Sequence, residues 1–410
     1  MNCRVAVTGI GIISSCGIGK KNFSQSIYQG KSGIRPIKHF NPNSFPTKIA
    51  GYIDEFDPVN YMDQRNMPRG RATQLAVSAM TLAFKDAGLS LNEVKNPFRN
   101  GVIIGTSVSG LSYYDQELKN FYKHGIMNPY ACIGIFGGSV SSELSRRISA
   151  KGTSFTLTNG CTAGTDAIGC AFHMIRNNQA DLIVCGGTEA PITPAMLSGF
   201  CSLHVLSKNN DNPEKASRPF DINRDGMVLS EGSGIMILES LEKAKQRNAN
   251  ILAEIIGYAA TNDDFHPITP DPEARSAIHC IQQAIDDAGI SKEEIHCINA
   301  HGTATIKNDL METTAIKAVF GVHAKKIPVS AIKSMTGHSI GAAGVIETIG
   351  AIISLTDDFI PPTINLNQND PECDLDYVPN KARNQSVDVI LKNSFGFGGK
   401  NAALVIRRFN

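Results

Sequence analysis

Two copies of one short motif, about 200 residues apart, constrain the fold of this 410-residue chain more than any other feature. The copies are Asp86-Ala-Gly88-Leu-Ser90 and Asp287-Ala-Gly289-Ile-Ser291, and each ends a segment whose apolar residues recur at helical spacing. Glycine is common at the end of any helix, so the motif alone can recur by coincidence. Because the same order of elements surrounds both copies, we predict an internal duplication of an αβ unit, with halves of roughly 200 residues.

The segments around the two motifs predict alternating helices and strands. Helices are expected at Thr73–Ala87 and Ala277–Ala288, and strands at Val102–Ile104 and Ile295–Ala300. This alternation favours an α/β protein with mostly parallel sheets covered by helices. The sequence has no low-complexity linker, so we expect an N-terminal half (1–250) and a C-terminal half (251–410) that pack as one body.

The composition is that of an ordinary globular protein and argues against several classes of function. Hydrophobic residues make up 42% of the chain and charged residues 19%. The net charge of +1 gives no overall field that would attract nucleic acid or a membrane surface. The ten cysteines form no C-x-x-C pair, which argues against zinc and thioredoxin-type sites, so no metal is expected.

The N-terminal segment indicates neither secretion nor dinucleotide binding. A predicted strand, Arg4–Thr8, follows the first methionine with no signal-peptide pattern, and no apolar run approaches the length of a membrane span. Together with many unpaired cysteines, this favours a cytoplasmic protein. Gly9-Ile-Gly11 follows the strand, but Ser14 stands where a dinucleotide fingerprint requires its third glycine.

Cys161 is the strongest candidate nucleophile. A β-prone run, Ser154–Thr158, ends at Asn159-Gly160, and small residues at helical spacing follow the cysteine up to Ile175. We therefore expect Cys161 on the first turn of a buried helix, where free N–H groups and the helix dipole lower a thiol pKa. Taken alone, this pattern does not outweigh a buried structural cysteine, the commonest kind of free cysteine.

Three later segments place polar residues after predicted strands. Asn299–Thr305 contains His301 beside two threonines, as in a catalytic loop, although a histidine that caps backbone groups would look the same. Val329–Gly344 repeats the design around Cys161, and its alternative is a helix packed tightly through glycine and alanine. Asn393–Gly399 follows the predicted strand Val387–Leu391, and a glycine-rich turn there can direct backbone N–H groups into a site.

Taken together, these segments resemble the signatures of the β-ketoacyl-[acyl carrier protein] synthases. The stretches NGCTAG, NAHGTAT, IKSMTGH and NSFGFGG occur in the family's order, and VAVTGIGIIS, GGTEAP, SRPFDINRDG and GAAGVIE match as well. The resemblance covers essentially the whole chain. It implies the thiolase fold, in which two similar halves form a five-layered αβαβα body, and this agrees with the duplication inferred from the two motifs.

The resemblance also implies a reaction and its central residues. An acyl chain is transferred from a carrier-protein thioester to Cys161, and malonyl-carrier protein then loses carbon dioxide and attacks that acyl group. His301 and His338 complete a triad with Cys161, as neutral imidazoles that donate N–H groups to the developing enolate. The backbone N–H groups of Cys161 and Phe397 form the oxyanion hole, and the Phe397 ring is the gate that moves when an acyl group is loaded.

Further residues have supporting roles by the same resemblance. Lys333 is expected near His338 as a charged partner, with Glu347 supporting this network from its helix and Asp309 as a second supporting carboxylate. Thr303 and Thr305 resemble the hydroxyls that bind the phosphopantetheine arm of the carrier protein. No cofactor beyond that arm is implied.

Two residues lead to an expectation about the substrate. Phe200 resembles a residue that lines the acyl tunnel, and Met227 stands beside the expected site where phenylalanine is usual. Gly160, where fatty-acid enzymes usually have alanine, and the contexts of Lys333 and His338 look closer to the ketosynthase subunit of type II polyketide systems. We therefore favour a type II polyketide or polyene pathway, with housekeeping fatty-acid elongation as the alternative.

Other members of the wider family make different predictions at the same positions. A chain-length-factor-like subunit, which shapes another subunit's tunnel and is not an enzyme, would lack Cys161. A biosynthetic thiolase would use another cysteine–histidine set with coenzyme A, and an initiating synthase would have asparagine in place of His338. Acyl carrier protein is the expected partner, within a homodimer or a heterodimer with a chain-length-factor-like subunit, and neither nucleic acid nor a membrane is expected.

Overall fold

The strand order in the second half of the chain repeats that in the first. The computed structural model describes residues 3–68, 70–91 and 96–409. Its main sheet region consists of two five-stranded sets that meet where the start of β1 pairs with the start of β9. The first set, in spatial order, is β6 (Ser154–Leu157), β5 (Asn100–Gly105), β7 (Leu182–Glu189), β8 (Gly232–Ser240) and β1 (Val5–Ser14). The second is β11 (Val329–Ser330), β10 (Cys297–Asn299), β14 (Val389–Gly396), β15 (Lys400–Arg408) and β9 (Ala253–Asn262).

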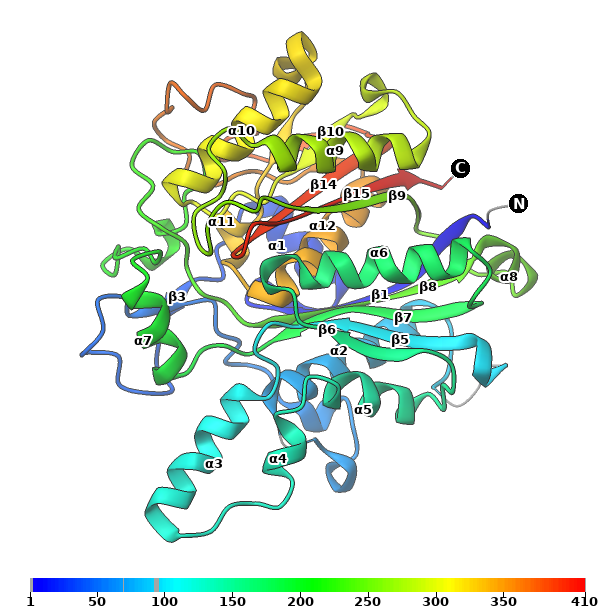
Figure 1. The fold of residues 1–410 in the computed structure, drawn as a ribbon, viewed down its shortest axis with the longest axis vertical. Coiled ribbons are helices and arrows are strands. Elements are labelled where there is room, and N and C mark those ends of the chain that lie inside the picture. Colours follow the sequence, from blue (N-terminus) through cyan, green and yellow to red (C-terminus); the bar gives the residue numbers. More distant parts are fainter. Residues whose placement is uncertain (1–2, 69, 92–95, 410) are drawn as a thin grey trace.

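Strand directions repeat as well. In each set the first three strands run parallel and the last two are antiparallel to their neighbours. Two helices lie between the two sets and two cover each outer face, which gives five layers (Figure 1). The inner helices are α6 (Ala163–Arg176) and α12 (Ala343–Asp357), and the outer ones are α2 (Arg71–Asp86), α5 (Ser139–Arg147), α9 (Arg275–Ala288) and α10 (Ile306–Phe320). The predicted αβαβα thiolase fold with duplicated halves is confirmed.

Equivalent atoms in the two halves explain why the duplicated motif recurs. The Asp86 carboxylate accepts a hydrogen bond from the backbone N–H of Ile10 at 3.0 Å, and Asp287 accepts one from Tyr258 at 3.0 Å. Each motif therefore ties the end of an outer helix to the strand of its set that pairs with the other set, β1 or β9. The motif glycines, Gly88 and Gly289, both have φ of +65°, the left-handed conformation expected just after a helix.

Two predicted strands are longer than the sequence indicated. β1 continues through the Gly9-Ile-Gly11 segment. The glycine at position 9 lets α2 pack closely against the strand, because a Cβ added there would lie 2.7 Å from Ala87 Cβ. β14 continues to Gly396, since its pairing with β15 extends to Lys400, so the glycine-rich turn is shorter than expected. The predicted strand at 295–300 is three residues long.

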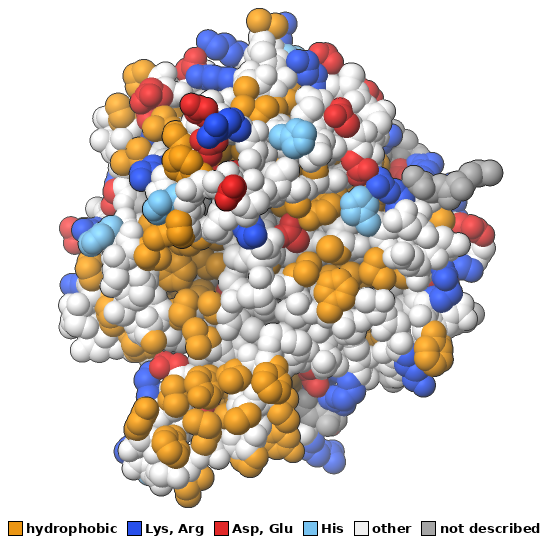
Figure 2. All heavy atoms as spheres, in the orientation of Figure 1, with side chains coloured by type: hydrophobic (Ala, Val, Ile, Leu, Met, Phe, Trp, Pro, Cys, Tyr) orange, Lys and Arg blue, Asp and Glu red, His pale blue; other side chains and the backbone are white. Residues whose placement is uncertain are grey.

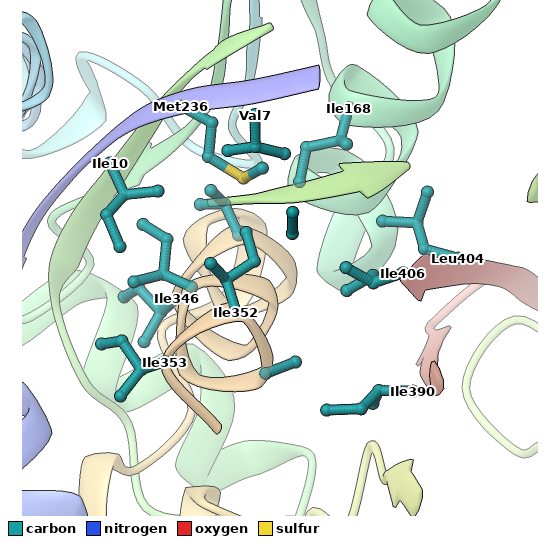
Figure 3. Close-up of a cluster of buried hydrophobic side chains, with 14 of the residues drawn as sticks. Val7, Ile10, Ile168, Met236, Ile346, Ile352, Ile353, Ile390, Leu404 and Ile406 are labelled. Atoms are coloured by element: carbon teal, nitrogen blue, oxygen red, sulfur yellow. The ribbon is translucent and has the colours of Figure 1, made fainter. Parts of the chain in front are cut away.

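The innermost helix explains one apparent exception to the sequence argument. Ile340–Asp357 is long and apolar enough to cross a membrane by length and composition, contrary to the expectation that no run approaches that length. However, 89% of this segment is buried inside the protein, as is usual for a core helix that is apolar on all sides. Figure 3 shows its Ile346, Ile352 and Ile353 packed among side chains of β1, α6 and β15.

Candidate active site

The cysteine lies at the junction of β6 and α6. Cys161 occupies a 3₁₀ turn, Gly160–Thr162, immediately before α6, rather than the first turn of the α-helix itself. Gly160 has φ of +60°, which allows the chain to turn sharply before the cysteine. Cys161 is 7% exposed and lines a small pocket. This places the sulfur where the two halves of the chain meet, next to residues of β14 and of the loop before α12.

His338 points its ring at the cysteine. Its Nε2 lies 3.2 Å from Cys161 Sγ, and its Nδ1 accepts a hydrogen bond from the backbone N–H of Ile340 at 3.2 Å. Because an N–H group can only donate, Nδ1 carries no proton and the neutral ring has its proton on Nε2. His338 therefore directs an N–H group at the sulfur and into the pocket.

His301 is held in the same tautomer by a different group. The Lys333 ammonium lies 3.0 Å from His301 Nδ1 and also donates to the His301 carbonyl at 2.6 Å. An ammonium is a donor only, so Nδ1 accepts and Nε2 carries the proton. The two histidine rings are nearly perpendicular with centroids 5.4 Å apart. Lys333 was expected beside His338, and the structure places it against His301 instead.

Burial and charge determine the protonation states in the pocket. Burial, with the nearby positive charge of Lys333, lowers the pKa of His301 and of His338 well below the usual histidine value, so both rings are neutral. Burial also raises the pKa of the Cys161 thiol to about 11, although Lys333 and the backbone N–H of Phe397 act in the opposite direction. The expected lowering of the thiol pKa is therefore wrong, because desolvation by burial outweighs the groups that favour the thiolate.

Most of the predicted site residues line one pocket. The lining includes Cys161, His301, His338, Thr303, Thr305, Met227 and Phe397. The hydroxyls of Thr303 and Thr305 lie 2.9 Å apart. Phe200, on α7 (Pro194–Ser202), packs against the apolar cluster that contains Cys161 and Met227.

Three predicted residues, Lys333, Glu347 and Asp309, lie behind the pocket rather than in its lining. Glu347, on α12, is paired with Lys333 through its Oε1 atom. Asp309 is fully buried, and its carboxylate accepts from the Phe220 backbone N–H at 2.8 Å and lies 3.6 Å from Arg224. Asp309 therefore holds the loop around residue 220 and does not reach the pocket.

The sequence argument missed three buried charged residues. Glu312 accepts hydrogen bonds from the backbone N–H groups of His301 and Gly302, each at 2.8 Å. Glu189 accepts from Ser107 N at 2.7 Å and Gly341 N at 3.1 Å, which joins the loop after β5 to the turn after His338. Glu189 lies in the matched stretch GGTEAP at the end of a buried strand, and this position was a usable signal. The third residue, Lys392, is considered below.

Within the described residues, no group of three or more His, Cys, Asp or Glu side chains is arranged to hold a metal ion. The pocket instead presents one thiol, two imidazole rings and the hydroxyls of Thr303 and Thr305. Such a set can hold an acyl group covalently and stabilise negative charge on a thioester oxygen without a metal.

Comparisons with known proteins agree with this chemistry. The model of the β-ketoacyl synthase N-terminal domain matches residues 2–244, and that of the C-terminal domain matches residues 252–367. The chain belongs to the β-ketoacyl synthase family. It is 42% identical to the 3-oxoacyl-[acyl-carrier-protein] synthase 2 of Coxiella burnetii over 99% of this chain and 98% of that protein, and 42% identical to that of Synechocystis over the same shares. These relatives make it an acyltransferase-class enzyme.

Solved structures of ketosynthases are similar over the full length of the chain. A ketosynthase solved with its type II polyketide acyl-carrier protein and bound hexaketide has a TM-score of 0.91 and 33% identity, covering 100% of both chains. The ishigamide ketosynthase/chain length factor has a TM-score of 0.91 and 34% identity, again covering 100% of both. The β-ketoacyl synthase described here is therefore similar both to enzymes named 3-oxoacyl-[acyl-carrier-protein] synthase 2 and to a ketosynthase of a type II polyketide system.

Proposed function

We propose that this β-ketoacyl synthase elongates fatty acyl chains carried on acyl carrier protein. The observation that carries the proposal is the convergence of Cys161 Sγ, His301 and His338 in one buried pocket. One thiol for covalent holding and two N–H donors for an anionic oxygen are the parts that a decarboxylative Claisen condensation needs.

The first step is transfer of the acyl chain to the cysteine. Cys161 Sγ attacks the carbonyl carbon of the acyl thioester, and the backbone N–H groups of Cys161 and Phe397 stabilise the oxyanion that forms. The bond to the carrier sulfur then breaks, and the cysteine's proton leaves with the carrier thiol. The N–H of His338, directed at Sγ, favours the thiolate during this step and offsets part of the cost of its burial.

The second step forms the new carbon–carbon bond. The malonyl thioester loses carbon dioxide, and the electron pair of the broken bond enters an enolate whose oxygen accepts from His301 Nε2–H and His338 Nε2–H. The enolate carbon attacks the acyl group on Cys161, and the thiolate leaves. Both histidines need to be neutral with the proton on Nε2, and this is the tautomer that Lys333 and the Ile340 N–H favour.

Part of the pocket wall beside the cysteine is apolar, which suits a hydrocarbon substrate. Cys161 and Met227 line the pocket and belong to a buried hydrophobic cluster whose other buried members are Ile37, Ala50, Ile192, Leu197, Leu206, Leu229 and Ile340. The fatty-acid enzymes named 3-oxoacyl-[acyl-carrier-protein] synthase 2 are also more similar in sequence than the polyketide ketosynthases. We therefore propose the fatty-acid alternative in place of the polyketide pathway that the sequence motifs favoured.

A polyketide or polyene role is the second candidate, because Met227 is buried and lines the pocket beside Cys161. An unbranched thioether adapts to irregular contacts and moves aside for an unsaturated or oxidised chain more easily than a ring. If Met227 serves such substrates, Met227→Phe lowers their turnover relative to saturated chains of equal length. An unchanged ratio between the two substrates removes this argument.

The partners proposed for this enzyme are acyl carrier protein and a second subunit. Hydrophobic side chains gather over α3 (Leu111–His124) and α4 (Ala131–Gly134) in Figure 2, among them Tyr122, Ile126 and Tyr130 at 81%, 74% and 63% exposure. A patch of this kind typically marks a protein interface. We place the dimer contact here, beside the exposed edge strand β6, with an identical subunit as partner.

We also propose that the enzyme needs no cofactor and that it works in the cytoplasm.

The proposal is tested by mixing the purified protein with malonyl-carrier protein and saturated acyl-carrier protein, with no second subunit added. We expect release of carbon dioxide and a β-ketoacyl product two carbons longer, measured by mass spectrometry of the carrier, together with a dimer in size-exclusion chromatography. Condensation that requires an added non-identical subunit, or that occurs only with oxidised or unsaturated acyl chains, would overturn the fatty-acid assignment.

A further inference from the structure

Lys392 is a fully buried lysine to which the reaction described above gives no role. It lies on β14, on the strand that leads to Phe397, and its side chain is 0% exposed. The ammonium lies 3.0 Å from Glu347 Oε2 and 3.2 Å from the Thr165 hydroxyl of α6, and it donates to the Ser394 hydroxyl. Lys392 thus connects both inner helices to the strand that carries the gate.

The second contact of Glu347 connects Lys392 to the catalytic histidine. Glu347 Oε1 is paired with the Lys333 ammonium, which in turn contacts His301 Nδ1 at 3.0 Å. The two oxygens of one buried carboxylate therefore face two ammonium groups. Buried charges of this kind are stable only when they are paired. Removal of either ammonium therefore changes the net charge of the group of side chains next to His301.

We propose that Lys392 is a positioning residue for the condensation: its ammonium holds one oxygen of Glu347, the other oxygen of Glu347 holds Lys333, and Lys333 keeps the Nδ1 atom of His301 unprotonated. This role rests on the proposed function of His301. The positive charge of Lys392 also lowers the pKa of both His301 and His338. The charge of Lys392 therefore helps to keep both N–H donors neutral at lower pH.

The other charged groups around this pair have been considered for the pH argument. Burial lowers the pKa of Lys392, and the charge of Lys333 lowers it further, whereas Glu347 and Glu312, which lies beside the His301 backbone, act in the opposite direction. Burial raises the pKa of Asp166 on α6, and the charge of Lys392 acts in the opposite direction. Burial raises the pKa of Glu312 to about 7, so Glu312 contributes a titration of its own that is present in wild type and variants alike.

The test is the pH dependence of malonyl decarboxylation in Lys392→Met, whose side chain has a similar length and no charge. Loss of a positive charge raises the histidine pKa, so the acid limb of the rate profile moves to higher pH. Each pH unit of displacement corresponds to about a tenfold loss of neutral imidazole on the acid side. Lys119→Met, which removes an exposed ion pair with Asp115, is the matched control and leaves the limb in place.

A second pair of variants keeps the test decisive if Lys392→Met folds poorly. Glu347→Gln leaves two uncompensated ammonium groups and moves the acid limb to lower pH, and adding Lys392→Met moves it back towards higher pH. Stoichiometric labelling of Cys161 by iodoacetamide verifies that each variant has an intact pocket. Variants that lose rate equally at all pH values would overturn the role of Lys392 while leaving the function of Cys161, His301 and His338 intact.

Discussion

The two halves of the molecule use the same backbone turn for different purposes. In the first half the 3₁₀ turn Gly160–Thr162 precedes α6, and in the second the 3₁₀ turn Ile340–Ala342 precedes α12. The residue that opens each turn has positive φ, +60° at Gly160 and +45° at Ile340. The residues just before the two helices also agree, with φ, ψ of −88°, −13° in one half and −86°, −14° in the other.

The side chains on the two turns differ completely. Cys161 occupies the middle of the first turn, whereas Gly341 occupies the middle of the second and donates its backbone N–H to Glu189. The second half carries its reactive group earlier, as His338, just before the turn. In the proposed reaction the duplicated frame therefore divides the work: the first half holds the acyl chain, and the second supplies the groups for decarboxylation.

Removal of the thiol should have the largest effect on activity and should separate the roles of the two halves most clearly. We expect Cys161→Ala to abolish acyl transfer and to remove one site of labelling by a thiol-reactive reagent, because no other cysteine lines the pocket in the described part of the chain. Malonyl decarboxylation should persist, since both histidines and Lys333 are untouched. Intact-mass analysis after incubation with acyl-carrier protein measures the loading, and labelling at unchanged stoichiometry would argue against Cys161.

Substitution of the histidines should have the opposite effect, with decarboxylation lost more than acyl loading. His301→Ala and His338→Ala each remove one oriented N–H donor, which typically costs ~10²–10³ in rate. We expect this loss in malonyl decarboxylation and a smaller loss in the loading of Cys161. The two rates are measured separately, by carbon dioxide release and by intact mass. Normal decarboxylation in both variants would show that the enolate is stabilised elsewhere.

A methyl group on the second turn should destabilise the protein through steric overlap alone. Gly341 has an ordinary φ, but a Cβ there would lie 2.7 Å from Ser107 N and 2.7 Å from Thr106 Cα, both backbone atoms that cannot move aside. We expect Gly341→Ala to lower the free energy of unfolding by ~2–3 kcal/mol. Urea denaturation followed by circular dichroism measures this change. A stability equal to that of wild type would mean that the second turn has room for the methyl group.

How much of this could be read from the sequence depended on whether the signal was local. The duplicated motif predicted two helix ends, and the strand–turn–helix pattern predicted the position of Cys161, because each pattern lies within one short stretch of sequence. Lys392 lies in a strand-like segment far from Glu347, so the sequence contains no sign that the two meet. The raised pKa of Cys161 has the same origin, since desolvation depends on residues from both halves packing around the thiol.

The smallest effect is expected from the matched substitution on the first turn, Gly160→Ala. The nearest atom to an added Cβ is the Phe397 carbonyl oxygen at 3.8 Å, so there is space for the methyl group. The cost comes only from φ of +60°, which disfavours a side chain by about 1 kcal/mol. We expect Gly160→Ala to unfold at slightly lower urea than wild type, to retain Cys161 labelling, and to lose less stability than Gly341→Ala. Equal losses in the two alanine variants would contradict the comparison, because space limits the second turn and backbone conformation limits the first.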